Sequence, residues 1–244
     1  MSYKTALITG ASRGIGKAIA LTLAAAGYHL MLTCRKNSEM LEDLKAYIER
    51  HYPVTCLTFV GDMGDFESVR RMYELFSSRY SSLDVLVNNA GISQVGLLTD
   101  LTPEEWNRLV QTNLSAVFYT CKYGLPYMLQ KKAGKIINIS SVWGISGASC
   151  EVAYAATKGG VNALTKALAK ELAPSNIQVN AIACGAIDTD MNEFLSAEEL
   201  SALILEIPSG RLGVPEDVAH LLLNLCTKND YLTGQVIKLD GGWI

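Results

Sequence analysis

Short apolar runs alternate with longer amphipathic segments along the whole chain. Runs rich in Val, Ile and Leu predict seven strands, and the segments between them have the apolar spacing of helices. The predicted strands are residues 5–9, 28–34, 54–60, 84–87, 136–139, 177–182 and 235–239, and the predicted helices are 15–26, 38–51, 66–80, 102–128, 153–172 and 215–226. Continuous apolar strands separated by helices are typical of a parallel sheet covered on both faces. The pattern therefore predicts a doubly wound α/β fold.

One domain accounts for all 244 residues, because no linker, repeat or low-complexity tract interrupts the pattern. The exception to the regular pattern is residues 188–211, which are longer than usual connections. This stretch contains two amphipathic pieces, one with Met191, Phe194 and Leu195 and one with Leu203, Ile204, Leu205 and Ile207. It is interpreted as a lid over a substrate, since ligands bind beyond the carboxyl ends of such strands. Surface helices that pack locally are the alternative.

Composition removes several classes of function. The net charge of −3 argues against a nucleic-acid partner. Six cysteines without a CxxC pair predict free thiols in a reducing cytoplasm. The three histidines lack metal-ligand spacing, so no metal site is expected. No apolar run reaches the ~20 residues of a membrane span, and we expect no signal peptide.

A glycine-rich turn follows the first predicted strand, with Gly10, Gly14 and Gly16. Glycine permits a tight turn and a close approach of the backbone to a pyrophosphate. The helix that follows offers free N–H groups and its positive end to such an anion. The spacing differs from the commonest dinucleotide fingerprint, G-x-G-x-x-G. The turn nevertheless favours a Rossmann-like nucleotide-binding domain, with a plain tight turn as the alternative.

The second predicted strand ends at Arg35 rather than at an acid, and Arg13 lies inside the glycine turn. Folds that prefer NAD place an acid near this point to bind the ribose 2′-hydroxyl. Two guanidinium groups suit a 2′-phosphate instead. The residues therefore predict NADP(H) rather than NAD(H), unless both arginines are simply solvated.

Two further polar segments follow strands at the same edge of the predicted sheet. Asp62 and Met63 follow the third strand, and residues 88–91 (Asn-Asn-Ala-Gly) follow the fourth. Asp62 is a candidate acceptor for an adenine amino group, and Asn88 to Gly91 form a candidate backbone platform. Either segment alone is a routine loop.

Tyr154 and Lys158 carry the strongest chemical signal. On a helix, residues four apart share one face. A phenol has a pKa of about 10, and a nearby positive charge lowers it. The pair is therefore predicted to protonate a carbonyl or deprotonate an alcohol. The alternative is that both are exposed helix residues.

Together these motifs resemble the short-chain dehydrogenase/reductase family over essentially the whole chain. The matching positions are Thr9, Gly10, Gly14, Gly16, residues 88–91, Asn113, Ser141, Tyr154 and Lys158. Within that family the chain is most similar to β-ketoacyl-acyl-carrier-protein reductases. This likeness includes residues 91–93, 137–141, 188–191, 211–219 and 239–242.

The resemblance implies a role for each matching residue. Tyr154 would protonate the developing alkoxide and Ser141 would bind the substrate carbonyl. Lys158 would bind the nicotinamide ribose and lower the pKa of Tyr154, and Asn113 would hold a relay water. The implied cofactor-binding set is Gly10, Ser12, Arg13, Gly14, Ile15, Gly16, Arg35, Asp62, Met63, Asn89, Ala90, Gly91, Tyr154, Lys158, Ile187 and Thr189.

Two positions depart from the family pattern. Cys184 stands where relatives usually have proline before Gly185, which predicts a more mobile loop or, if the thiol is accessible, an oxidation-sensitive point; burial is favoured. The second departure concerns docking of an acidic carrier protein. Lys131, Lys132 and Lys135 offer a basic patch, but Ser175 replaces a second basic position.

Three functions remain open. NADPH-dependent reduction of a 3-oxoacyl thioester in fatty-acid synthesis leads, followed by the same chemistry on a sugar, steroid or small ketone, and by a non-catalytic cofactor-binding scaffold. Fold and catalytic residues do not choose among substrates. Residues 92–98, 142–152 and the lid hold that choice, and Trp143, Ile145, Met191 and Phe194 would form an apolar wall. The resemblance also implies a homotetramer through residues 104–128, 153–172 and the end of the chain.

Overall fold

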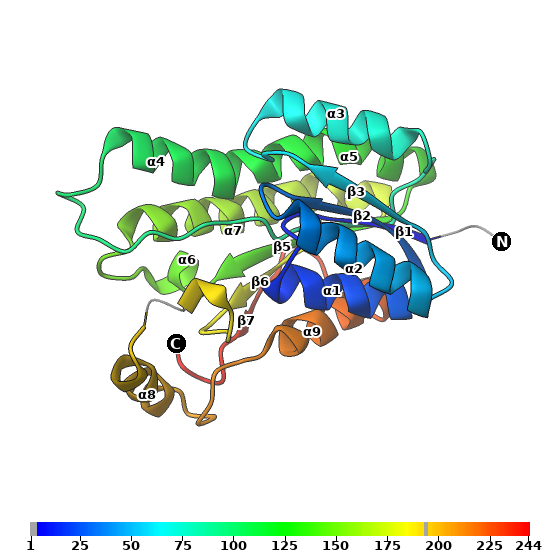
Figure 1. Cartoon of the computed structure of the whole chain (residues 1–244). Helices are drawn as coiled ribbons and strands as arrows, with labels where there is room; N and C mark the ends of the chain where they lie inside the picture. Colours follow the sequence, from blue (N-terminus) through cyan, green and yellow to red (C-terminus); the bar gives the residue numbers. More distant parts are fainter. Residues whose placement is uncertain (1–3, 193–194) are drawn as a thin grey trace.

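The structure is a computed structural model that describes residues 4–192 and 195–244. Its centre is a sheet of seven parallel strands in the order β3-β2-β1-β4-β5-β6-β7 (Figure 1). The strands are β1 Lys4–Ile8, β2 Tyr28–Cys34, β3 Cys56–Val60, β4 Val85–Asn88, β5 Gly134–Ser141, β6 Ile177–Cys184 and β7 Val236–Leu239. The predicted doubly wound α/β fold is therefore confirmed.

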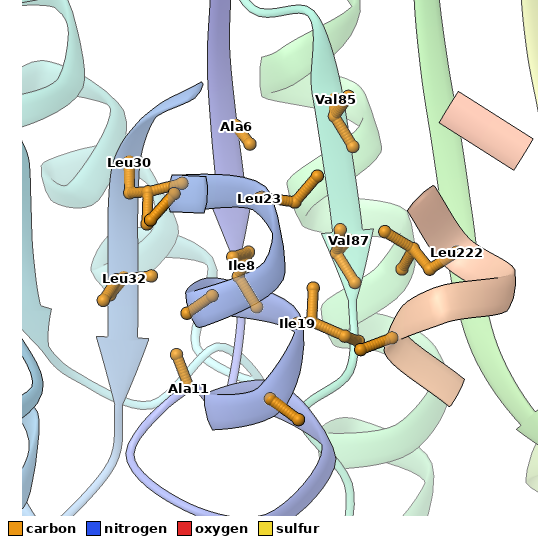
Figure 2. Close-up of a cluster of buried hydrophobic side chains, with 14 of the residues drawn as sticks. Ala6, Ile8, Ala11, Ile19, Leu23, Leu30, Leu32, Val85, Val87 and Leu222 are labelled. Atoms are coloured by element: carbon orange, nitrogen blue, oxygen red, sulfur yellow. The ribbon is translucent and has the colours of Figure 1, made fainter. Parts of the chain in front are cut away.

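Helices cover both faces of this sheet. Helices α1 (Gly14–Ala25), α2 (Ser38–His51) and α9 (Pro215–Thr227) lie on one face, and α3 (Phe66–Ser77), α4 (Pro103–Val110), α5 (Ala116–Lys131) and α7 (Val152–Leu172) on the other (Figure 1). Because side chains of a strand alternate between faces, Ala6 and Ile8 join one core and Leu7 joins the other. Figure 2 shows Ile19 and Leu23 of α1 packed on the first core.

The order in which strands are added to the sheet changes side at β1. Strands β2 and β3 lie on one side of β1, and β4 to β7 lie on the other. The loops after β1 and β4 therefore separate at the carboxyl edge of the sheet and leave room there for a ligand. All the strands that precede the predicted polar segments end at this same edge, because the sheet is parallel.

The helical segment from Pro103 to Lys131 contains a π-turn, Gln111–Ser115, between α4 and α5. It begins as predicted, with Thr102 and Glu105 forming a capping box. Helix α5 continues through Gly124 and Pro126. Gly124 serves packing, since a Cβ there would lie 2.6 Å from the Tyr73 hydroxyl of α3.

The predicted lid contains two helical pieces, η3 (Asp190–Asn192) and α8 (Ala197–Glu206). Ser196 and Glu199 cap α8 reciprocally. Phe194, predicted to line the site, lies outside the described residues. A short helix, α6 (Trp143–Ser146), and a 3-10 turn, η2 (Ala173–Ser175), had no clear signal in the pattern. Other boundaries shift slightly: β3 begins at Cys56 and α3 ends at Ser77.

Candidate active site

A cavity of about 600 Å³ opens at the carboxyl edge of β1, β2, β3 and β4. Most of the residues predicted to bind a cofactor line it: Gly10, Ser12, Arg13, Gly14, Ile15, Arg35, Asp62, Met63, Asn89, Ala90, Gly91 and Thr189. Residues not predicted to bind the cofactor also line it, namely Thr33, Cys34, Lys36, Asn37, Gly61, Ile92, Ser93, Arg108, Thr112, Asp190 and Met191. Their shared signal is position, since several directly follow β2 or β4.

The three glycines of the turn have different roles. Gly10 and Gly14 have positive φ angles of 66° and 52°, which favour glycine. Gly16 does not line the cavity; a Cβ there would lie 2.2 Å from the Gly10 carbonyl oxygen. Gly16 therefore lets α1 approach the turn closely, so that the N-terminus of α1 faces the cavity.

Asn89 and Thr9 fasten the turn after β1 to the segment after β4. The Asn89 side chain donates to the carbonyl oxygens of Thr9 at 3.0 Å and Gly10 at 2.9 Å. The Thr9 hydroxyl accepts from the backbone N–H groups of Asn89 and Ala90, both at 3.0 Å. The predicted backbone platform at residues 88–91 is therefore tied to the glycine turn through Asn89 and Ala90.

Both candidate phosphate-binding arginines pair with a carboxylate. Arg35 Nε lies 3.0 Å from Asp62 Oδ2, and Arg13 Nη1 lies 2.7 Å from Asp190 Oδ2 in the lid. All four side chains are more than a third exposed, so each guanidinium remains accessible to a ligand. The Arg13 contact also joins the glycine turn to the lid.

The four predicted catalytic residues converge beside the cofactor cavity. Tyr154 and Ser141 share a side-chain hydrogen bond. The Lys158 ammonium lies 5.6 Å from the centre of the Tyr154 ring and donates to the Ile139 carbonyl oxygen at 2.8 Å. Tyr154 is 8 % exposed, Ser141 7 % and Lys158 5 %. The alternative of exposed helix residues is therefore wrong.

Burial controls the protonation of this group. It raises the pKa of Tyr154 above its ordinary value, although the bond to Ser141 opposes the rise. Burial also lowers the pKa of Lys158 to about 8. The expectation that Lys158 lowers the pKa of Tyr154 stays a prediction, because the causes that act on this phenol are burial, Ser141, Cys184 and Glu151.

Asn113 is presented by the π-turn between α4 and α5 and is buried. Its side-chain oxygen accepts from the Ile92 N–H at 2.9 Å, and its amide nitrogen donates to the Ile92 carbonyl at 2.8 Å and the Thr157 hydroxyl at 3.1 Å. A Cβ on Gly91 would lie 3.4 Å from Asn113 Oδ1 and 3.5 Å from Lys158 Nζ. The π-turn therefore brings this amide to the lysine, as π-turns often do at functional sites.

A second cavity, of about 450 Å³, adjoins the first and holds Ser141, Tyr154 and Lys158 in its wall. Ile187 lines this cavity rather than the cofactor cavity. Trp143 and Met191 line it as predicted, whereas Ile145 does not and is 50 % exposed. Val95, Glu151, Leu203 and Glu206, from the segments predicted to choose the substrate, also line it, and so does Trp243, which was not predicted to.

Cys184 is part of β6 and pairs with both neighbouring strands, opposite Ser141 in β5 and Leu239 in β7. The loop after β6 therefore begins beyond Cys184, and its extra mobility stays a prediction. Burial raises the pKa of the Cys184 thiol to about 12, which keeps it protonated. The favoured interpretation, a buried thiol, is confirmed.

The predicted basic patch lies at the opposite edge of the sheet from the two cavities. Lys131 ends α5 and Lys135 lies at the start of β5. Lys131 pairs with Asp84, and Lys135 Nζ lies 2.9 Å from Asp230 Oδ1. Two of the three lysines therefore carry compensated charges.

Two other features, a metal centre and a membrane-spanning helix, concern the side chains and helices of the described part of the chain. Among residues 4–192 and 195–244, no group of three potential metal ligands gathers in one place. In the same part of the chain, no helix combines the length and apolar character needed to cross a bilayer.

Comparison with known proteins places this geometry in a family. The family model described as short chain dehydrogenase matches residues 4–200. The chain belongs to the short-chain dehydrogenase family, a class of oxidoreductases.

Three similar proteins bear on the substrate. The chain is 41 % identical over 240 residues to the 3-oxoacyl-[acyl-carrier-protein] reductase FabG of Staphylococcus aureus, covering 98 % of this chain and 97 % of that one. It is 41 % identical over 242 residues to the uncharacterized oxidoreductase YmfI of Bacillus subtilis, covering 98 % of each. The solved structure of YwfH, titled an NADPH dependent reductase involved in bacilysin biosynthesis, matches with a TM-score of 0.94, 29 % identity and 100 % and 99 % coverage.

Proposed function

We propose that the protein catalyses NADPH-dependent reduction of a 3-oxoacyl thioester to the 3-hydroxyacyl thioester. The observation that carries the proposal is that Ser141, Tyr154 and Lys158 together line the substrate cavity, which adjoins the cofactor cavity. The likeness to FabG of Staphylococcus aureus supports the choice of substrate.

The cofactor is NADP(H), and when bound it supplies the hydride. Its pyrophosphate fits the glycine turn, where a Cβ on Gly10 would lie 2.9 Å from the Ala90 Cα. Arg13 and Arg35 bind the 2′-phosphate, with Lys36 as a further cation at the same wall. Asp62 holds Arg35 in place and is the acceptor for the adenine.

The protein's own residues hold the ketone and move the proton. The Ser141 hydroxyl binds the substrate carbonyl, and its Oγ is oriented by the Trp143 N–H at 3.2 Å. The Tyr154 hydroxyl then donates its proton to the oxygen as negative charge develops there. Because burial keeps Tyr154 protonated, the acid is ready before substrate arrives.

Lys158 and Asn113 restore that proton. An ammonium has three N–H donors. The bond from Lys158 to Ile139 uses one of them, so the ribose can take the others. An amide oxygen has two lone pairs, so Asn113 Oδ1 can accept from a relay water in addition to the Ile92 N–H. The two residues thus connect Tyr154 to solvent.

Residues 188–211 serve as the lid of the substrate cavity, to which Met191, Leu195, Leu203 and Glu206 contribute. We also propose a homotetramer in the cytoplasm. Trp106 and Phe118, 38 % and 50 % exposed on α4 and α5, are apolar contact residues for a partner subunit. Trp243, by contrast, faces this chain's own substrate cavity. A light-scattering mass of one subunit at micromolar concentration contradicts the tetramer.

A second candidate is NADP(H)-dependent reduction of a different ketone. It is favoured by the likeness to YwfH, a reductase of bacilysin biosynthesis, over the whole chain. The catalytic residues serve both candidates equally, because substrate choice lies in the loops.

The test follows NADPH absorbance with the acetoacetyl thioesters of acyl carrier protein and coenzyme A, with simple ketones as controls. Oxidation that is fastest with the carrier-protein thioester supports the proposal. It also indicates that docking succeeds without a basic residue at Ser175. Turnover of a simple ketone with neither thioester reduced moves the protein to the second candidate.

A further inference from the structure

The substrate cavity contains two carboxylates, Glu151 and Glu206, that the proposed proton transfer does not use. Each is bound by a tryptophan. The Trp143 side chain forms a hydrogen bond with Glu151, and Trp243 Nε1 donates to Glu206 Oε2 at 3.3 Å. The two indole rings pack edge to face with centres 4.9 Å apart. These four side chains, here called the acceptor edge, come from α6, the start of α7, α8 and the C-terminal segment.

Glu151 occupies an unusual place for its residue type. It is the N-cap of α7, where a side chain commonly accepts from the first free N–H groups of the helix. Glu151 makes no such bond. Its carboxylate is half-buried and meets the Trp143 indole instead. The carboxylate therefore does not cap the helix, and Glu151 lines the substrate cavity instead.

The Glu151 carboxylate also lies close enough to Tyr154 for its charge to raise the pKa of that phenol. Ser141 and Tyr154, both more than nine-tenths buried, line the same cavity. A substrate whose ketone reaches these two hydroxyls therefore extends past Glu151. Among the described lining residues, Lys158 is the one cation, and it is bound to Ile139 behind Tyr154.

A carboxylate has about four lone-pair positions that can accept hydrogen bonds, and one indole N–H fills one of them. A half-buried carboxylate that lacks further donors loses solvation without compensation. The acceptor edge is therefore complementary to a substrate that brings N–H or O–H donors. It is unfavourable for a substrate with a second anionic group at this place.

We propose that Glu151, seated on Trp143, is a specificity-determining residue that accepts a hydrogen bond from an N–H or O–H donor of the substrate. Glu206 extends the same edge toward the lid. The inference rests on the proposed function. In a pantetheine thioester, an amide N–H is separated from the sulfur by one ethylene group, and this N–H is the donor that the acceptor edge binds.

The test compares two thioesters of 3-oxobutanoate that differ in this donor. The N-acetylcysteamine thioester has the amide N–H, and the S-ethyl thioester lacks it. kcat/KM is measured with saturating NADPH for the natural protein, Glu151→Ala, Glu151→Gln and Glu198→Gln. Glu198 lies on α8 and is exposed, outside the cavity lining, so its variant is the matched control. NADPH binding, followed by nucleotide fluorescence, shows that each variant is folded.

The natural protein is expected to prefer the amide-bearing thioester by about tenfold, the scale of one hydrogen bond to a charged group. Glu151→Ala should lower kcat/KM for that thioester about tenfold more than for the S-ethyl thioester. Glu151→Gln, which keeps an acceptor oxygen without the charge, should retain part of the preference. Glu198→Gln should keep all of it.

Two results overturn the inference while the reductase function stands. One is equal turnover of both thioesters by the natural protein. The other is an equal loss on both thioesters in Glu151→Ala, which means that Glu151 only supports Trp143. A natural protein that reduces neither thioester but does reduce another ketone removes the proposed function, and the inference falls with it.

Discussion

The cofactor cavity and the substrate cavity share a wall but are built in different ways. The cofactor cavity is formed by turns that directly follow β1, β2, β3 and β4, and its key contacts are backbone groups and glycines without side chains. The substrate cavity is formed by side chains from α6, α7, α8 and the C-terminal segment, which meet only in the folded protein. The first is built mainly by backbone turns at strand ends, and the second mainly by side chains that separate helices bring together.

Because of this difference, the first cavity determines how the cofactor binds and the second determines which substrate is accepted. A pyrophosphate is the same in every dinucleotide, so a rigid backbone cradle suits it. Substrates vary, and side chains on loops can change without disturbing the sheet. Ser141, Tyr154 and Lys158, held by β5 and α7, line the substrate cavity, which adjoins the cofactor cavity. The reaction therefore depends on both halves, but each half should fail in its own way when it is altered.

The largest expected effect is on Tyr154, in the substrate cavity. Tyr154→Phe removes the proton donor and keeps the ring, so turnover should fall about 10²- to 10⁴-fold. NADPH binding should persist, because the glycine turn is untouched. Steady-state NADPH oxidation and nucleotide fluorescence check the two halves separately. Undiminished turnover would remove Tyr154 from the mechanism.

A substitution in the cofactor cavity should weaken the binding of NADPH rather than the proton transfer itself. In Gly16→Ala the new Cβ meets the Gly10 carbonyl oxygen, so the turn and α1 must separate. The NADPH dissociation constant should rise by about 100-fold or more, by analogy with the cost of backbone strain. Gly96→Ala is the control, since nothing lies within 4 Å of its added Cβ. Equal affinity in both variants would contradict the cradle.

Arg35→Ala should change the choice of cofactor rather than the reaction. Loss of one charge-assisted bond to the 2′-phosphate should lower kcat/KM for NADPH roughly 10- to 100-fold. The value for NADH should change little, because NADH has no phosphate at this place. Competition of the two cofactors for the natural protein supplies the baseline. A parallel loss for both cofactors would assign Arg35 to folding instead.

The smallest expected effect is the dependence on pH. The pKa of Lys158, lowered by burial to about 8, means that the ammonium is charged below that pH and neutral above it. The raised pKa of Tyr154 keeps the phenol protonated throughout this range. Reduction should therefore slow as pH rises through about 8. Lys158→Arg, which stays charged, should lose this inflection; a flat natural profile to pH 10 would exclude Lys158 as the group responsible.

The cofactor cavity was easier to predict from the sequence than the substrate cavity. Apolar runs and the glycine turn are local signals in the sequence. They predicted the strands, the sheet edge at which the cofactor residues gather, and most of the residues that line the cofactor cavity. The π-turn that presents Asn113 has no local signal in the sequence. The pairing of Trp243 with Glu206 joins positions 37 residues apart, and the pairing of Trp143 with Glu151 depends on how the loop between α6 and α7 folds. The pKa of Tyr154 depends on burial, which the spacing to Lys158 does not report.

Transfer of a labelled hydride tests the central claim most directly. The protein is incubated with NADPH carrying deuterium at the reactive C4 position and with an acetoacetyl thioester, and the product is examined by mass spectrometry. The account predicts one deuterium at the hydroxyl-bearing carbon of the 3-hydroxyacyl product for each NADPH consumed. NADPH consumption without deuterium at that carbon, or no 3-hydroxyacyl product at all, would contradict it.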